Sequence, residues 1–212
     1  MSLRYLAPLA FAAFIALPAS AQEAPADAAP RELTERFDRV ALSAADLPVR
    51  AEEFAAAERA VGPETLRSLR YAADRIERFH RECAPRSWRM KDDNGSQLGQ
   101  EVRPLDRVAA YVPGGRPAYP STVLMTVGAA RVAGGRGVLV VSPPGRDGSL
   151  NPAVLAAARI AGVTEAYRVG GAQAVAALAY GTETIRRVDN IVGPRNIYVT
   201  LAKAHVFGNV GI

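Results

Sequence analysis

The sequence VAAYVPGGRPAYPSTVLMTVGAARVAGGRGVLVV at residues 108–141 holds two short apolar runs, 108–112 and 137–141. Between them lie Pro-Gly-Gly at 113–115 and an alanine-rich stretch that predicts a helix over 121–132. An apolar run, a helix and a second apolar run are typical of two parallel strands joined by a crossover helix. The pattern therefore predicts an α/β fold.

The same alternation continues toward the carboxyl end. Asn-Pro at 151–152 is a typical helix start, and Gly162 is a typical helix end. Further strands are predicted at 164–169 and 188–192, and further helices over 152–161, 172–180 and from about 196 to 207. Repeated crossover units predict a parallel sheet with flanking helices.

Three loops rich in glycine and proline follow predicted strands, at 113–118, 170–173 and 193–196. Parallel sheets bind ligands outside the carboxyl ends of their strands. Glycine lets a ligand approach the backbone, and helix N-termini offer free amides to anions. The loops therefore favour nucleotide or phosphate binding. The alternative is that these glycines only form tight turns, because neither G-x-G-x-x-G after a strand nor G-x-x-x-x-G-K-[ST] occurs.

Three side chains beside these loops are the candidate site residues. Tyr111 ends a predicted strand, and its ring either stacks on a planar ligand or is half-buried in the sheet. Gln173 follows a Gly-Gly pair and either binds a ligand or lies on a helix surface. Asn196 begins the last helix and either caps it or reaches a ligand.

Residues 31–84 show a helical pattern. Ser43 with Asp46 three residues later is a candidate N-cap, and Pro63 fits the first turn of a second helix. Residues 85–100 are polar and predict a loop or hairpin. One apolar stripe at helical spacing predicts packing against a larger body, and it consists of Leu66, Leu69, Ala73, Ile76 and Phe79.

The first thirty residues differ from the rest. Residues 1–21 combine a positive charge, an apolar run and Ala-Ser-Ala at 19–21, which is typical of a secretory signal peptide. The apolar run is too short for a stable membrane span, and 22–30 is an Ala/Pro linker. A simple upstream extension is the alternative to a signal. The predicted organisation is then a helical region at 31–100 and an α/β domain at 101–212.

Composition excludes several kinds of protein. The chain has 212 residues, a net charge of +5 and no run of basic residues, so a nucleic-acid-binding surface is not expected. Cys83 is the one cysteine, which excludes an internal disulfide and a cysteine-rich zinc site. His80 and His205 lack the spacing of paired metal ligands.

Four segments resemble the histidinol dehydrogenase family: YVPGGRPAYPSTVLM at 111–125, ARVAG at 130–134, RVGGAQAVAALAYGTETI at 168–185 and VDNIVGPRNIYVTLAK at 188–203. ERFDRV at 35–40 and AADRIERFH at 72–80 resemble the amino-terminal region of that family. The resemblance implies incomplete Rossmann-like domains. It also implies oxidation of L-histidinol to L-histidine through the aldehyde, in histidine biosynthesis, with NAD and zinc in a cytoplasmic homodimer.

By motif position, the resemblance assigns the NAD contacts to Tyr111, Gln173 and Asn196. The zinc ligands, the Glu-His acid/base pair and the substrate contacts of the family are expected beyond Ile212, so this chain alone is expected to lack dehydrogenase activity. Arg195 replaces the glycine usual in the family, which implies either strain or a contact with the cofactor pyrophosphate. Two alternatives are a non-catalytic nucleotide-binding remnant and an exported, periplasmic dehydrogenase-like protein.

Overall fold

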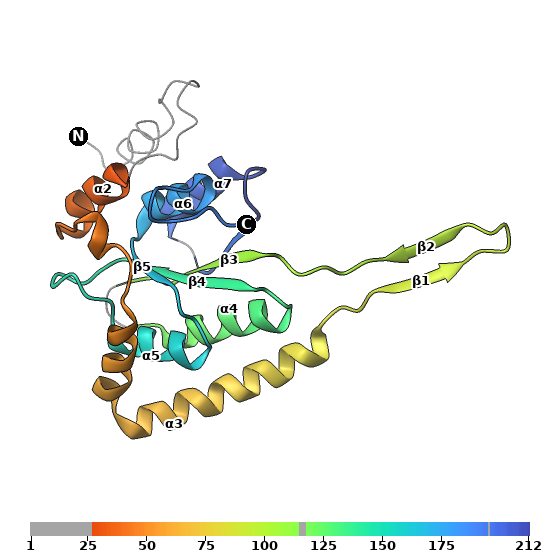
Figure 1. The fold of residues 1–212 in the computed structure, drawn as a ribbon, viewed down its shortest axis with the longest axis horizontal. Helices are drawn as coiled ribbons and strands as arrows, with labels where there is room; N and C mark the ends of the chain where they lie inside the picture. Colours follow the sequence, from red (N-terminus) through yellow and green to blue (C-terminus); the bar gives the residue numbers. More distant parts are fainter. Residues whose placement is uncertain (1–26, 115–117, 195) are drawn as a thin grey trace.

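A computed structural model describes residues 27–114, 118–194 and 196–212. A four-stranded sheet forms its middle layer (Figure 1). The helices α6 (Gly171–Tyr180), α7 (Ile197–Val206) and α2 (Ala28–Asp38) lie on one face of this sheet. The helices α4 (Pro120–Val132), α5 (Pro152–Ile160) and α3 (Ala51–Cys83) cover the other. The predicted α/β fold with a preceding helical segment is confirmed.

The sheet is parallel, with strand order β5-β4-β3-β6. Its strands are β3 (Arg107–Tyr111), β4 (Gly137–Ser142), β5 (Ala166–Arg168) and β6 (Asn190–Val192). Because β3 is central and the chain moves outward from it in both directions, the loops after β3 and β6 lie side by side. The predicted strands at 164–169 and 188–192 are shortened to three residues each.

Alternate residues of the sheet enter two different cores. Ala109, Tyr111, Leu139 and Val141 pack with α6 and α7. Their neighbours Ala110, Val112, Val138 and Val140 pack with α3, α4 and α5. A strand that is buried on both faces needs apolar residues at every position, which is why the sequence shows continuous apolar runs.

The predicted amino-terminal caps form, with one difference. The Asp46 carboxylate accepts hydrogen bonds from the Ser43 N–H at 3.0 Å and the Ser43 hydroxyl at 2.5 Å, but the turn they cap is the 3₁₀ element η2 (Ala44–Asp46). Inside α3, Gly62 leaves the helical conformation at φ 77° and Pro63 begins the second helical part. A kink at this pair is expected, because Pro63 has no N–H to donate to the preceding turn and its ring clashes with the backbone of that turn.

The predicted apolar stripe on α3 is correct except at its end. Leu69 is buried, and Leu66, Ala73 and Ile76 pack against the same core as α4 and α5. Phe79 was expected to extend the stripe, and this is wrong because its side chain is 64% exposed. The carboxyl end of α3 leads toward the projecting hairpin (Figure 1).

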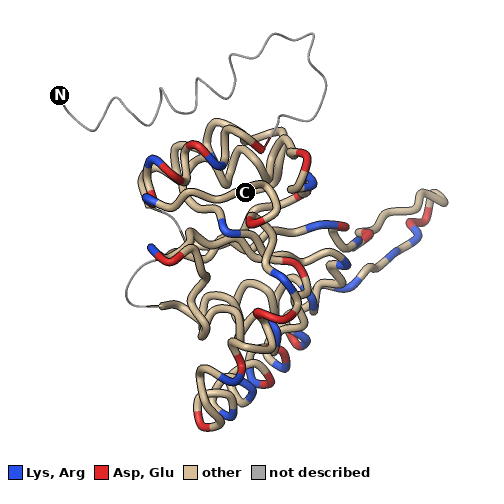
Figure 2. The backbone as a smooth tube through the Cα atoms, turned by 60° about the vertical axis from the view of Figure 1, so that its left-hand side comes forward, with Lys and Arg blue, Asp and Glu red and all other residues tan. Residues whose placement is uncertain are grey.

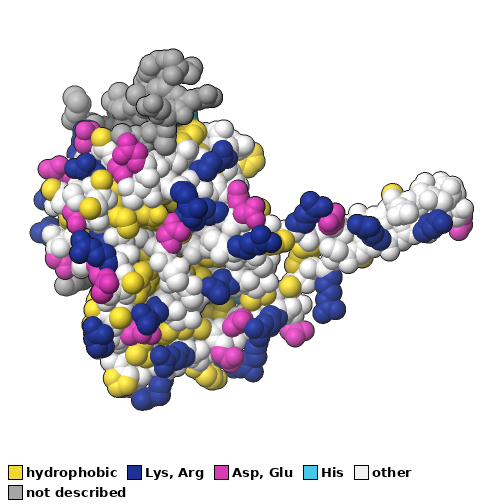
Figure 3. Space-filling view, in the orientation of Figure 1, with side chains coloured by type: hydrophobic (Ala, Val, Ile, Leu, Met, Phe, Trp, Pro, Cys, Tyr) yellow, Lys and Arg dark blue, Asp and Glu magenta, His cyan; other side chains and the backbone are white. Residues whose placement is uncertain are grey.

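Residues 85–100 contain a hairpin of β1 (Trp88–Lys91) and β2 (Gln97–Gln100), which confirms one of the two predicted forms. The hairpin projects from the body, and all of its strand residues are exposed (Figures 1 and 3). The division at residue 100 stays a prediction. The shared core of α3, α4 and α5 nevertheless places α3 in the layered body.

Charge is mixed over the described surface. Basic and acidic residues alternate along the tube of α3 (Figure 2), and both signs are interspersed on the face in Figure 3. This distribution is typical of a solvated surface. Within the described ranges no helix is long and apolar enough to span a bilayer. The signal-like residues 1–21 lie outside the described part of the chain.

Candidate functional site

The loops after the strands meet at the carboxyl edge of the sheet. A Cβ on Gly114 would lie 2.5 Å from Pro143 Cγ, and a Cβ on Gly170 would lie 2.5 Å from Pro143 Cβ. Pro143, which follows β4, thus separates the glycine loops that follow β3 and β5. The approach is too close for any side chain larger than hydrogen, so packing explains why these positions are glycine.

Gly193 joins the third loop to this edge. A Cβ there would lie 2.1 Å from the Tyr111 carbonyl oxygen, and the backbone φ of +127° is itself unfavourable for other residues. The loop after β6 therefore presses directly on the end of β3. All three glycine loops predicted from the sequence converge around Tyr111.

Tyr111 is buried, with 3% of its surface exposed. Its hydroxyl oxygen accepts a hydrogen bond of 3.0 Å from the Gly171 N–H, the first amide of α6. Burial raises the pKa of Tyr111, the Gly171 hydrogen bond opposes that rise, and the nearby Asp38 carboxylate adds to it. The ring therefore belongs to the core, and the hydroxyl is the part of Tyr111 directed at the glycine loops.

Gln173 lies in the first turn of α6 and is 5% exposed, so the surface-helix alternative is wrong. Its Oε1 lies 2.5 Å from the position that a Cβ on Gly171 would take. The amide thus folds back over the residue whose N–H binds Tyr111. The Tyr111 hydroxyl and the Gln173 amide therefore both lie against Gly171, at the start of α6.

Asn196 caps α7. Its Oδ1 accepts a hydrogen bond of 2.9 Å from the Val199 N–H, which confirms the capping alternative, and the residue is exposed. It stands three residues after Gly193, on the same edge as Tyr111. Arg195 lies outside the described residues.

Comparison with known proteins agrees with this arrangement. A family model for histidinol dehydrogenase matches residues 21–212. The chain is 56% identical over 186 residues to histidinol dehydrogenase of Synechococcus sp., and 55% identical over 186 residues to that of Geobacillus kaustophilus. The chain belongs to the histidinol dehydrogenase family.

A solved histidinol dehydrogenase from Elizabethkingia anophelis has the same fold, with a TM-score of 0.87 at 32% identity over the whole of this chain. The family is one of oxidoreductases of histidine biosynthesis. The present chain covers 43% of the length of each of the two sequence relatives and 47% of the solved chain. It therefore spans less than half of the proteins that it resembles.

The described residues do not fit a zinc site. No group of three or more His, Cys, Asp or Glu side chains gathers in the ranges 27–114, 118–194 and 196–212. Cys83 is exposed, and His80 makes an edge contact with the Phe79 ring. No step of the reaction can be assigned to zinc from these side chains.

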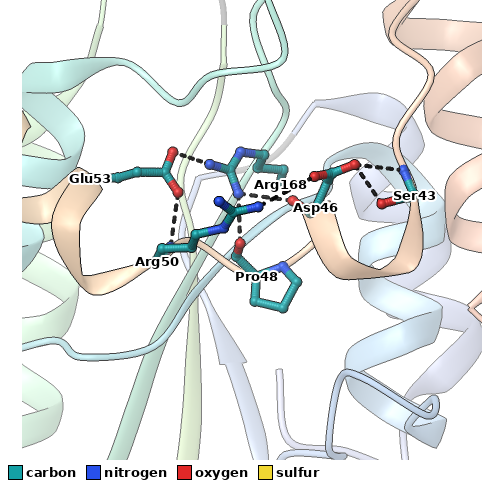
Figure 4. A network of polar contacts seen from close by, with 6 residues as sticks. All are labelled: Ser43, Asp46, Pro48, Arg50, Glu53 and Arg168. Atoms are coloured by element: carbon teal, nitrogen blue, oxygen red, sulfur yellow. Dashed lines mark hydrogen bonds and ion pairs between the residues drawn. The ribbon is translucent and has the colours of Figure 1, made fainter.

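A buried arginine braces the amino-terminal segment against the sheet (Figure 4). One guanidinium nitrogen of Arg168 donates to the carbonyls of Asp46 at 2.8 Å and Pro48 at 2.7 Å, and another donates to the Glu53 carboxylate. Burial acts to raise the pKa of Glu53, but hydrogen bonds from Arg168 and the Arg50 N–H outweigh it and lower the pKa.

A cleft of about 800 Å³ opens beside this brace, lined by both signs of charge. Four arginines and four acidic residues contribute to its lining: Arg39, Arg50, Arg146, Arg168, Asp46, Glu52, Glu53 and Asp147. The Arg168 guanidinium already donates to three acceptors of the protein, so it stabilises the fold and does not offer a free positive charge to this cleft. The brace joins residues more than 100 positions apart, so spacing in the sequence gave no sign of it.

Asp38 is a second residue that the sequence pattern did not single out. It ends α2, its Oδ2 is buried, and no hydrogen-bond partner reaches that oxygen within the described structure. Burial raises the pKa of Asp38 from 3.8 to about 6. Asp38 lies in the motif ERFDRV, which resembles the amino-terminal region of the family, and this was the one feature of the sequence that could have drawn attention to it.

The close approach at Gly193 yields a matched test. Gly193→Ala should destabilise the fold by several kcal/mol, because the new methyl group meets the Tyr111 carbonyl. Gly208→Ala is the control, since Gly208 has a similar left-handed φ of +95° but nothing within 4 Å of a new Cβ. Urea unfolding measures both. Equal losses would show that strain in φ, rather than the Tyr111 contact, fixes Gly193.

Asp38 should also make stability depend on pH. Its folded pKa of about 6 exceeds the ordinary 3.8, so the folded state binds more protons between these values and stability falls as pH rises through them. Asp38→Asn should therefore stabilise the chain by about 1–3 kcal/mol at pH 8 and hardly at all near pH 4. Urea unfolding at both pH values measures this, with exposed Asp93→Asn as control. An equal gain at both pH values would contradict the burial of the charge.

Proposed function

We propose that this chain carries the NAD-contact portion of a histidinol dehydrogenase. The dinucleotide would lie across the carboxyl edge of the sheet, over the loops that follow β3, β5 and β6. The convergence of these loops around Tyr111 carries the proposal. Their glycines remove side chains where a ligand must approach the backbone, and the edge is the ordinary ligand-binding side of a parallel sheet.

Each candidate residue has a distinct role in this proposal. The Tyr111 hydroxyl fixes the start of α6 by binding the Gly171 N–H. The buried Gln173 amide can both donate to and accept from polar groups of the dinucleotide. Asn196 holds the start of α7, so that the amides of this helix keep a fixed direction. Stacking of NAD on the Tyr111 ring is not part of the proposal, because the ring is buried in the core.

NAD, when bound, supplies the hydride acceptor for oxidation of an alcohol. The described residues of this chain bind and orient the dinucleotide, and no group of metal-ligating side chains gathers among them. We propose that the zinc ligands, the Glu-His pair and the histidinol contacts belong to the part of the family's length that this chain does not span. L-histidinol as substrate, homodimer formation and a cytoplasmic location, where NAD is available, are further parts of this proposal.

Titration with NAD tests the binding role. The 212-residue chain should bind NAD, and Gln173→Ala should weaken binding about tenfold, the loss of one to two hydrogen bonds. The matched control is Gln97→Ala, a glutamine exposed on the projecting hairpin, which should bind like the original chain. Calorimetry measures the affinities, and thermal melts confirm folding. Equal affinities in all three proteins would contradict the assigned site.

An activity assay tests, separately from NAD binding, whether the chain alone catalyses the oxidation. Histidinol, NAD and zinc at high protein concentration should yield no NADH above background, because the reacting groups are assigned elsewhere. Absorbance at the NADH band measures this. Sustained, zinc-dependent NADH formation by the pure chain would show that the described residues contain more of the reaction site than is proposed.

A further inference from the structure

The cleft beside the Arg168 brace has no role in the proposed function. Its volume of about 800 Å³ is in the range of pockets that hold small organic molecules. One wall comes from residues within 39–53, and the other is the loop 146–149 that follows β4. None of the three candidate dinucleotide residues lines it.

Packing between the two walls forms this cleft. A Cβ placed on Gly148 would lie 3.6 Å from Val40 Cγ1 and 3.7 Å from Leu42 Cδ2, so the loop after β4 lies against the segment after α2. Arg39 directly precedes Val40, and Arg146 is two residues before Gly148. Two arginines that are far apart in the sequence therefore line one cleft.

Most of the charged groups in the cleft are already engaged. Its four arginines and four acids balance in formal charge, which disfavours a multiply charged anion as its ligand. Three of the acids accept hydrogen bonds from the protein: Asp46 from Ser43, Glu53 from Arg168, and Asp147 from Ser149. Arg168 donates to three acceptors, and Arg50 Nη2 lies 3.9 Å from Asp46 Oδ1 (Figure 4).

Arg39, Arg146 and Glu52 are the charged groups that remain. All three are exposed, and among the described residues none of them has a hydrogen bond or an ion pair. Arg39 also adopts a left-handed backbone at the end of α2, with φ 60° and ψ 38°. Glycine is the usual residue in this conformation, because other residues are strained there, and such strain is more common at binding sites.

These remaining groups define the class of a ligand. Guanidinium groups bind carboxylates, and the Glu52 carboxylate can accept from an ammonium group. An apolar part of the lining is formed by Val40, Ala41 and Leu42. A small molecule with a carboxylate, an ammonium group, an apolar side chain and no net charge is an amino acid.

We propose that this cleft binds a free α-amino acid with an apolar side chain, whose carboxylate contacts Arg39 and Arg146 and whose ammonium group contacts Glu52. The residues of this site differ from the proposed NAD contacts, so the two proposals can be tested separately. L-leucine binding without NAD binding would overturn the proposed function alone. NAD binding without L-leucine binding would overturn the amino-acid site alone.

Titration of the isotopically labelled 212-residue chain with L-leucine tests this site. Amide chemical shifts follow the binding, and the largest changes are expected in the loop 146–149. Isocaproate lacks the ammonium group of leucine and isoamylamine lacks its carboxylate, so each should bind about fivefold more weakly. Equal affinities for L-leucine and isocaproate would overturn the amino-acid class, and the absence of saturable shifts would overturn the site.

Substitutions test the two ends of the ligand. Arg146→Gln should weaken the binding of both L-leucine and isocaproate about fivefold, whereas Glu52→Gln should weaken the binding of L-leucine alone. The matched control is Arg136→Gln, an exposed arginine that precedes β4 at its other end, and it should bind like the original chain. Thermal melts confirm folding. Equal losses in Arg136→Gln and Arg146→Gln would show general charge attraction and overturn the site.

Discussion

The contact between Gly193 and the Tyr111 carbonyl is the constraint on which the rest of the edge depends. It presses the loop after β6 onto the end of β3 with no room for a Cβ. From the same residue, the Tyr111 hydroxyl reaches the first amide of α6. Tyr111 thus links the ends of β3, β5 and β6, because its hydroxyl binds the start of α6 and its carbonyl meets Gly193. Any ligand bound at this edge meets a backbone surface that Tyr111 has organised.

The carboxylates of Glu53 and Asp38 are both partly buried, but their pKa values shift in opposite directions. Glu53 is paired with Arg168 and the Arg50 N–H, and its pKa is lowered despite burial. In the part of the chain that the structure describes, Asp38 has no such partner for one of its oxygens, and burial raises its pKa to about 6. The first arrangement secures the amino-terminal segment to the sheet. The second leaves one buried carboxylate oxygen without a hydrogen-bond partner among the described residues.

The sequence carried the local information about this fold. Continuous apolar runs predicted strands that are buried on both faces, and the glycine loops marked the edge where Tyr111, Gln173 and Asn196 are found together. The Asn196 cap depends on contacts within three residues, and such contacts can be predicted from spacing. The contribution of these three residues to NAD binding stays a prediction.

Long-range packing could not be predicted in this way. The exposure of Phe79 could not be seen from its place in the apolar stripe, and the burial of the Tyr111 ring depends on α6 and α7. The bond between Arg168 and Glu53 joins two segments whose neighbourhood exists only after the sheet has formed. Asp38 belongs to the same class, because only the fold reveals that its buried Oδ2 has no hydrogen-bond partner among the described residues.

Amide chemical-shift mapping tests the central claim most directly. The isotopically labelled chain would be titrated with NAD while its backbone N–H signals are followed. The account predicts that the largest shifts fall on Gly114, Gly170, Gly171 and Gly193, with the signals of the projecting hairpin at 88–100 unchanged. Saturable shifts confined to other parts of the chain, or no shifts at millimolar NAD, would contradict a dinucleotide site at the edge that Tyr111 organises.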